Sequence, residues 1–163
     1  MRRALALLIL AAGGAQAGVT QAGGPRLTDA SVRAFVARQE AAWNARDAAG
    51  FAATFTPDAT IVDQARDNQN RLVENGRSTA PQAAVQARRF FAKHTVRETT
   101  QIGRIVIAPD GRSAQVFAHE VSQIATRGQP SRTLCGETEQ SLILVKGQIR
   151  SRGQTDTAIR CRH

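Results

Sequence analysis

Between residues 28 and 46 the apolar positions recur every three or four residues, the spacing that places them along one face of an α-helix. Thr28 or Asp29 is suited to cap the start of this helix. A second, short helix is expected over residues 47–55, and the Thr-Pro-Asp turn after it ends the helical part. The inward face of the first helix comprises Val32, Val36, Gln39 and Trp43, of which Gln39 is the polar member.

After this turn the pattern changes from helical spacing to alternation. Residues 59–64 contain a β-branched run and predict a strand in which Ile61 and Asp63 share one face. A short strand is expected at 71–74, ending before an Asn-Gly pair. A third helix is then expected from about residue 79 to 94, with Pro81 in its first turn.

The second half of the chain is rich in strands. Four long segments, 95–108, 112–126, 132–145 and 149–162, are separated by short turns that contain glycine. Consecutive strands joined by short turns form an antiparallel meander. Together with the helix-rich first half, this predicts an α+β fold in which three helices pack on a strongly curved, mixed, mostly antiparallel sheet.

The first 17 residues have the pattern of a secretory signal peptide: two arginines, an apolar run over residues 4–12 and the small-residue site Ala15-Gln16-Ala17. The apolar run is too short for a bilayer-spanning helix, although an uncleaved anchor is the alternative. We therefore expect a signal peptide at 1–17, a flexible lead-in at 18–27 and a single domain at 28–163. The mature chain is then expected in the periplasm of a bacterium or secreted, without membrane attachment.

Positive charge dominates the composition. The chain has 22 Lys and Arg against 13 Asp and Glu, a net charge of +9 at pH 7, which becomes +7 after the signal peptide and its two arginines are removed. An excess of basic over acidic residues can indicate nucleic-acid binding. Here the arginines are dispersed, and with no tyrosine and one tryptophan there are few aromatic rings to stack on bases. The sequence favours a solvated basic surface and no nucleic-acid partner.

Cys135 and Cys161 are the two cysteines of the chain. An even number in an exported protein predicts a disulfide, and two free thiols are the alternative. If Val145 pairs with Ile149 across the last turn, Cys135 lies opposite Ile159. Cys161 is two residues further along, so the bond requires a bulge or a shifted register.

One part of the sequence carries a family resemblance. Trp43 is followed by Asn44-Ala45-Arg46-Asp47, then by Phe55 and Asp58-Ala59, and Asn75-Gly76-Arg77 precedes a helix. This pattern resembles the nuclear-transport-factor-two-like superfamily, which includes ketosteroid isomerases, SnoaL-like polyketide cyclases and limonene-epoxide hydrolases. The resemblance implies a cone-shaped fold with an apolar cavity at its wide end. It also implies, for many members, a dimer formed through the outer face of the sheet. Alternation along the last strand places Arg150, Arg152, Gln154 and Asp156 in the outward row of that face, so the interface is expected to be polar.

The resemblance assigns Asp63 to the position of the general base in ketosteroid isomerases, where a carboxylate in an apolar cavity abstracts a proton beside a carbonyl. The alternative is a strand-end aspartate that faces solvent or pairs with an arginine. Gln39 occupies the position of the isomerases' oxyanion-donating tyrosine. The second donor position falls near Ser141, with Glu139 one inward-facing step away.

Other candidates come from the predicted faces of the helices and strands. His119 shares a strand face with Phe117 and Val121, so it can line the cavity as an acid or base, or can be a half-buried histidine without a role. Trp43, Phe55 and Phe91 are expected in the cavity wall.

Three functions remain open from the sequence. The first is binding of a small apolar or polyketide-like molecule without turnover. The second is a cofactor-free isomerase, cyclase or hydratase with Asp63 as general base. The third is a dimeric scaffold or accessory domain with a filled cavity. The histidines and cysteines show no metal-ligand spacing, and there is no glycine-rich phosphate loop, so we expect no metal and no cofactor.

Overall fold

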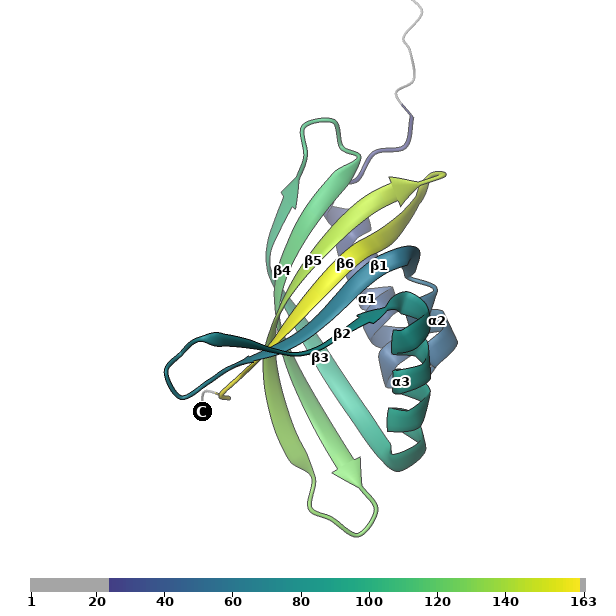
Figure 1. The fold of residues 1–163 in the computed structure, drawn as a ribbon. Coiled ribbons are helices and arrows are strands. Elements are labelled where there is room, and N and C mark those ends of the chain that lie inside the picture. Colours follow the sequence, from purple (N-terminus) through teal and green to yellow (C-terminus); the bar gives the residue numbers. More distant parts are fainter. Residues whose placement is uncertain (1–23, 162–163) are drawn as a thin grey trace, which may run out of the picture.

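The computed structural model describes residues 24–161, which form three helices and six strands (Figure 1). The strands make one sheet in the order β2-β1-β6-β5-β4-β3, in which β1 and β6 are parallel and the other neighbours antiparallel. The sheet is open and strongly curved, and the helices cover its concave face. This confirms the expected α+β class. The bounds are α1 Asp29–Asn44, α2 Ala48–Ala52, β1 Phe55–Arg66, β2 Leu72–Thr79, α3 Ala80–Lys93, β3 His94–Ile107, β4 Ser113–Thr126, β5 Arg132–Val145 and β6 Gln148–Ile159.

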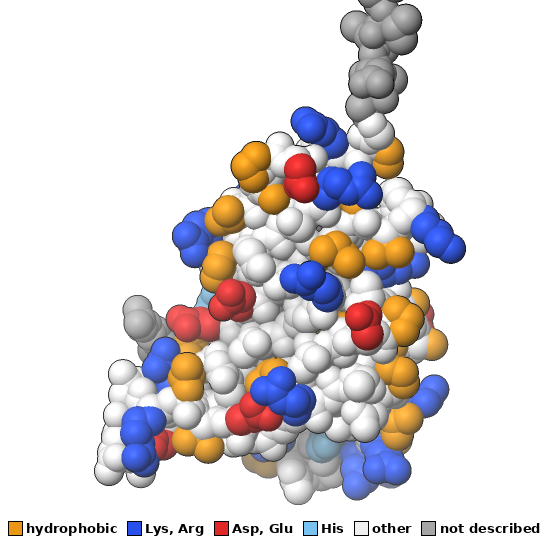
Figure 2. All heavy atoms as spheres, turned by 45° about the horizontal axis from the view of Figure 1, so that its top comes forward, with side chains coloured by type: hydrophobic (Ala, Val, Ile, Leu, Met, Phe, Trp, Pro, Cys, Tyr) orange, Lys and Arg blue, Asp and Glu red, His pale blue; other side chains and the backbone are white. Residues whose placement is uncertain are grey.

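The expected signal peptide, residues 1–17, lies outside the described residues. No helix within residues 24–161 is long and apolar enough to cross a membrane. On the face shown in Figure 2, the Lys and Arg side chains are dispersed among acidic and apolar ones.

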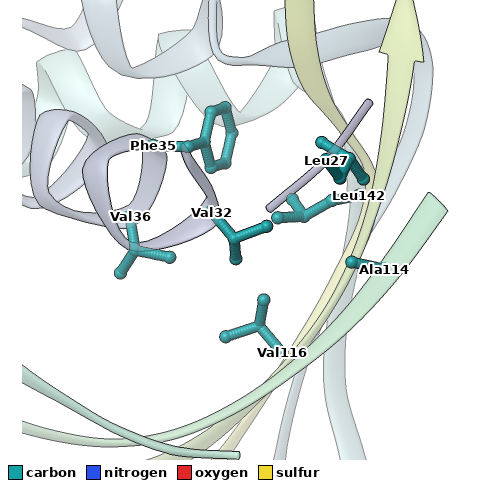
Figure 3. Close-up of a cluster of buried hydrophobic side chains, with 7 residues drawn as sticks. All are labelled: Leu27, Val32, Phe35, Val36, Ala114, Val116 and Leu142. Atoms are coloured by element: carbon teal, nitrogen blue, oxygen red, sulfur yellow. The ribbon is translucent and has the colours of Figure 1, made fainter. Parts of the chain in front are cut away.

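Helix α1 is held over the sheet by its cap and by its apolar face. Thr28 caps it in a reciprocal pair with Ser31. Its buried side chains pack on the concave face of β4 and β5 in one cluster (Figure 3). The cluster consists of Leu27, Val32, Phe35, Val36, Ala114, Val116 and Leu142.

The end of the expected lead-in is part of this core, which corrects the prediction of flexibility up to residue 27. Leu27 is 4% exposed. Its backbone N–H donates to the carbonyl of Gly111, in the β3–β4 turn, at 2.7 Å. Apolar burial together with this hydrogen bond fixes the chain before α1 begins.

Strand β1 begins earlier than the sequence pattern predicts. Phe55, expected at the end of a helix, already pairs with Ser151 of β6, and α2 ends at Ala52. The register shifts between Phe55 and Thr60, so the ladder skips Pro57, which has no N–H to donate. The result is a long β1 that reaches from the core to the open end of the sheet.

Strand β2 is also longer than predicted, because the Asn75-Gly76 pair does not end it. A register shift lies between Asp63 and Gln64 of β1, where Gly76 pairs with Asp63 and Glu74 with Gln64. Asn75 is therefore the extra residue of a bulge, and the strand continues to Thr79. The following helix, α3, starts as expected, with Pro81 in its first turn and Gln82 accepting from the Thr79 N–H at 2.9 Å.

A bulge in β6 reverses the side-chain alternation of that strand. Leu142 of β5 pairs with Ser151, whereas Ser141 pairs with Gly153, which leaves Arg152 as the extra residue. Before the bulge the buried Ser151 faces the helices, as Leu142 does. Beyond it, the side chains on the concave face are those of Gln154 and Asp156. The prediction that these two residues point outward was wrong for this reason.

The bulge also brings the two cysteines together. The β5–β6 turn contains two residues, Lys146 and Gly147, both with positive φ, so Val145 pairs with Gln148 rather than with Ile149. The extra residue at position 152 then restores the expected pairing of Cys135 with Ile159. Cys161 follows the end of the strand and forms a disulfide with Cys135, with a Cα–Cα distance of 5.2 Å. The predicted disulfide is confirmed.

Candidate functional site

Two adjoining hollows lie between the helices and the concave face of the sheet. The inner chamber, under α1, has a volume of about 90 Å³. The outer chamber, between α3 and the ends of β1, β4, β5 and β6, has a volume of about 460 Å³. The two chambers share four lining residues, Trp43, Phe51, Glu120 and Asp156, which we call the junction.

The walls of the outer chamber are mainly apolar. Trp43 stacks on Phe90, with ring centroids 5.9 Å apart, and contacts Phe51 at 5.0 Å. Helix α3 adds small side chains, Ala83 and Ala87, which leave room beside these rings. Trp43 Nε1 is buried and has no hydrogen-bond partner among residues 24–161. Further apolar side chains come from Ile61, Val96, Ile124 and Leu134.

The charged side chains that line the two chambers are all carboxyls. They come from five different elements, and neither chamber is lined by a Lys, Arg or His of the described chain. Asp63 and Asp156 are direct neighbours in the parallel β1–β6 pair. The set consists of Glu40 on α1, Asp63 on β1, Glu98 on β3, Glu120 on β4 and Asp156 on β6.

Hydrogen bonds orient three of these carboxyls. Asp156 Oδ1 accepts from the hydroxyl of Thr138 at 2.8 Å, and both its oxygens accept from Gln154 Nε2, at 3.0 and 2.8 Å. Glu98 Oε2 accepts from the hydroxyl of Ser122 at 2.7 Å. Glu40 Oε2 accepts from the backbone N–H of Thr100 at 2.8 Å. These carboxyls are therefore held in position on the sheet rather than directed to solvent.

A row of amides connects α1 to Asp156. Gln140 Nε2 donates to Gln39 Oε1 and to Gln154 Oε1, both at 2.9 Å, and Gln39 Nε2 donates to the hydroxyl of Thr54 at 3.1 Å. Because Gln154 also donates to Asp156, the row runs from the helix to the junction. This satisfies Gln39, the one polar residue of the inward helix face, which is 6% exposed.

Burial and mutual repulsion shift the acidities of the cluster upward. Desolvation, with the charges of Asp156, Glu98 and Glu40, raises the pKa of Glu120 to about 8. Desolvation and the charge of Asp63 raise the pKa of Asp156 to about 6, against the opposing effect of its hydrogen bonds. Burial also raises the pKa of Glu98 above its usual range. At pH 7 Glu120 is therefore mainly protonated, while Asp156 is mainly ionised.

Asp63 differs from the other carboxyls in its exposure. It lines the outer chamber on the same face as Ile61, but at the rim, where the residue is exposed to solvent. Partial burial raises its pKa, and no Lys or Arg side chain within residues 24–161 opposes this shift. It is therefore not enclosed by Trp43, Phe55 and Phe91, the residues expected in the cavity wall.

Comparisons with known proteins agree with this architecture. The sequence profile of the SnoaL-like domain matches residues 26–153. The chain belongs to the SnoaL-like domain family. Membership in the nuclear-transport-factor-two-like superfamily, expected from the sequence, is thereby confirmed. A search among curated proteins returns no match.

Solved structures similar to this SnoaL-like chain share its fold at low sequence identity. A ketosteroid isomerase-like protein from Erwinia carotovora atroseptica superposes with a TM-score of 0.64 at 13% identity, covering 81% of this chain and 96% of that chain. A conserved protein from Planctomyces limnophilus superposes with a TM-score of 0.65 at 13% identity, covering 80% of this chain and 94% of that chain. ActVI-ORFA from Streptomyces coelicolor superposes with a TM-score of 0.59 at 19% identity, covering 79% of this chain and 95% of that chain. At these identities the likeness is one of fold alone.

The structure places the predicted site residues of this SnoaL-like domain in three groups. Gln39 and Trp43 line the cavity and Asp63 lies at its rim. Phe55 and Phe91 are buried in separate apolar clusters behind the wall and line neither chamber. Phe51 and Phe90 occupy the wall in their place.

The third group faces away from the cavity, so its prediction as pocket lining was wrong. His119, Glu139 and Ser141 lie on the convex face of the sheet, where His119 and Glu139 line a separate groove of about 480 Å³. Ser141 exchanges hydrogen bonds with Gln115 of the neighbouring strand, at 3.0 and 3.1 Å. The reason is alternation: the inward residues of β4 and β5 are the even-numbered ones, such as Glu120 and Gln140.

Sequence reasoning missed three partly buried carboxyls of the chambers, those of Glu98, Glu120 and Asp156. In the sequence, Glu98 and Glu120 resemble ordinary solvent-facing residues of strands that have one polar and one apolar face. For Glu120 a signal exists, because Ala114, Val116 and Ala118 precede it on the same face and are smaller and more apolar than the alternate set. Asp156 carries no such signal, since its orientation depends on the bulge at Arg152. Within residues 24–161, no three His, Cys, Asp or Glu side chains are arranged to hold a metal ion.

Proposed function

We propose that this SnoaL-like domain binds a small, largely apolar molecule in the outer chamber, with a polar group of that molecule directed to the junction. The observation that carries the proposal is the chamber itself. Its volume of about 460 Å³ falls in the range of small-molecule sites, and its lining combines an apolar wall with a few convergent polar groups. A scaffold with a filled cavity is less well supported, because Trp43 and the phenylalanines border the chamber and do not close it.

The test is a binding titration with N-phenyl-1-naphthylamine, an uncharged apolar dye whose emission increases in apolar surroundings. We expect saturable binding to the purified domain. Gln86 lies at the chamber wall on the exposed side of α3, so Gln86→Phe narrows the opening and should weaken binding several-fold. Val85→Phe, at the neighbouring exposed position that lines neither chamber, is the matched control.

Two results would overturn the proposal. One is the absence of saturable dye binding to a folded domain. The other is equal weakening by Gln86→Phe and Val85→Phe, because this would place the dye outside the chamber. Native mass spectrometry of the freshly purified protein is an independent check, since an additional bound mass identifies a co-purified occupant.

A second candidate function is cofactor-free proton transfer, and the carboxyls of the junction favour it. A protonated Glu120 can donate a proton or hydrogen bond, while Asp156 or Asp63 can accept a proton. Two carboxyls with separated pKa values are the arrangement that general acid–base chemistry requires. In this alternative Asp63 keeps its proposed role as base at the chamber rim.

The enzyme alternative is tested by the exchange of a proton beside the carbonyl of an apolar cyclic ketone with solvent deuterium. Exchange above the buffer rate should fall by about 10²-fold or more in Asp156→Asn and Glu120→Gln, the usual contribution of a positioned acid or base. An exchange rate equal to that of buffer, with several ketones that bind, would exclude this function.

The proposed function also includes export of the chain and formation of a homodimer. We propose that the chain is cleaved after residue 17 and acts in the periplasm or outside the cell, which is supported by the N-terminal pattern and by the disulfide. Mass spectrometry of the protein expressed in a bacterium would show whether the mature chain starts at Gly18. We also propose a homodimer through the convex face of the sheet. Its partner list then consists of a small molecule and a second copy of the chain.

A further inference from the structure

The cavity and the chain as a whole carry opposite charges. The chain has a net charge of +9 at pH 7. The two chambers, in contrast, are lined by carboxyls from five elements and by no Lys, Arg or His of the described residues. A random sample of this basic sequence would include cations in a lining of that size. The lining of the two chambers is therefore negatively charged, although the chain as a whole is positively charged.

Within residues 24–161 these carboxyls have no counterion, and they repel one another. The charges of Asp156, Glu98 and Glu40 each raise the pKa of Glu120, and the charge of Asp63 raises that of Asp156. The salt bridges within residues 24–161 involve other acids, Asp29, Asp67 and Glu74, all outside the chambers. Protons are thus what neutralises the junction when the cavity holds no cation.

The apolar wall next to the carboxyls is suited to the same kind of ligand. Trp43, Phe51 and Phe90 form a continuous aromatic surface, with ring centroids 5.0 and 5.9 Å from that of Trp43. The face of an aromatic ring attracts a cation, most strongly in the case of tryptophan.

We propose that the cavity selects an organic cation: a molecule with an apolar body in the outer chamber and one protonated or quaternary nitrogen at the junction, between Glu120, Asp156 and the ring of Trp43. This inference rests on the proposed binding function and names the ligand class. It also implies that anions are excluded, because a carboxylate in the same place would face unpaired acids of its own sign.

The test uses three compounds with the same adamantane body: adamantylamine, adamantanol and adamantane carboxylate. Their affinities are measured by calorimetry with the full mature domain at pH 8. We expect the amine to bind about tenfold more tightly than the alcohol, a difference equal to one modest Coulomb interaction, and the carboxylate to bind most weakly. Equal affinities, or tighter binding of the carboxylate, would overturn the proposal.

Variants distinguish the effect of the junction carboxyls on amine affinity from the effect of the protein's net charge. Asp156→Asn and Glu120→Gln should bring the affinity of the amine down to that of the alcohol and leave the alcohol unaffected. Glu139→Gln removes the same charge from the opposite face of the same sheet and should retain the preference for the amine. Loss of the preference in Glu139→Gln as well would assign it to net charge and contradict the proposal.

Proton release gives a second readout that needs no variant. A cation at the junction favours the ionised form of Glu120 and Asp156, so binding of the amine should release protons and tighten between pH 5 and 8. The other titratable groups that face this site are Glu40, Asp63 and Glu98, and ionisation of each adds to the number of protons released. Calorimetry in two buffers of different ionisation enthalpy measures the number of protons released on binding. Amine binding without proton release would overturn the inference, whereas failure of all three compounds and of the dye would overturn the proposed function.

Discussion

Glu120 lies where the two chambers meet, and its acidity links the cavity to the stability of the fold. Its pKa is about 8 in the folded chain, against 4.5 for an unperturbed glutamate. The folded state therefore binds this proton more tightly than the unfolded state. The resulting stabilisation is complete below about pH 4.5 and is lost as the pH rises through 8.

We therefore predict that Glu120→Gln stabilises the domain at alkaline pH. The amide resembles the protonated acid and cannot ionise, so the free energy of unfolding at pH 9 should exceed that of the wild type by on the order of 3 kcal/mol. At pH 4.5 the two proteins should be equally stable. Urea unfolding at both pH values measures the difference, and a variant less stable than the wild type at pH 9 would contradict the prediction.

A second prediction concerns the pair Asp63 and Asp156. These carboxyls are neighbours in the parallel β1–β6 pair, and the charge of Asp63 contributes to the raised pKa of Asp156. Asp63→Asn should therefore shift the titration of Asp156 to lower pH, as followed by NMR of the side-chain carboxyl carbons. Glu139→Gln serves as the control and should leave that titration in place. An unchanged midpoint in Asp63→Asn would show that the two carboxyls do not interact.

At the scale of elements, the disulfide closes the β5–β6 hairpin. Cys135 and Cys161 are 26 positions apart, so the bond restricts a long loop in the unfolded chain. We predict that replacing both cysteines by serine lowers the free energy of unfolding by about 3 kcal/mol. Urea unfolding of this double variant, beside the reduced wild-type protein, measures the loss. Free thiols in the unfolded, unreduced wild type would contradict the premise.

Helical periodicity allowed more of the site to be predicted than strand alternation did. A helix face is set by the spacing of three and four, so Gln39 and Trp43 could be assigned to the cavity from sequence alone. A strand face depends on parity, and one extra residue reverses it. Arg152 is such a residue, which is why Asp156 was expected on the outside and lines the cavity instead.

The fold itself was predictable because several local signals agree. The capped helices, the Pro81 start of α3 and the glycine-containing turns each mark a boundary, and the resemblance gives their order. The length of β1 and β2 was not predictable. In both strands a residue normally read as a break, Pro57 or Asn75, is accommodated as a local irregularity between paired segments.

At the scale of the whole molecule, the convex face is the surface on which the proposed dimer depends. Arg104 lies over the ring of Phe117 on this face, at 4.1 Å from its centroid, beside the groove that contains His119 and Glu139. We predict a mass of two chains by light scattering at micromolar concentration. Phe117→Glu should reduce it to one chain, because it replaces an apolar ring on the proposed interface with a carboxylate, beside Glu139, that would lose its hydration on association.

The control for this experiment is Val85→Glu, which introduces the same charge on the exposed side of α3 and should leave the mass unchanged. A wild-type mass of one chain would refute the dimer. If both variants remain dimeric, the interface lies elsewhere on the surface.

The bulge at Arg152 divides β6 into two halves that can change independently. Its first half adds Ser151 to the packed interior beside Leu142, while its second half presents Gln154 and Asp156 to the cavity. A substitution of Asp156 changes the charge of the cavity lining, whereas the apolar cluster of Val32, Phe35 and Leu142 under α1 stays in place. Point mutations beyond the bulge can therefore change the cavity lining without repacking the apolar interior that lies before it.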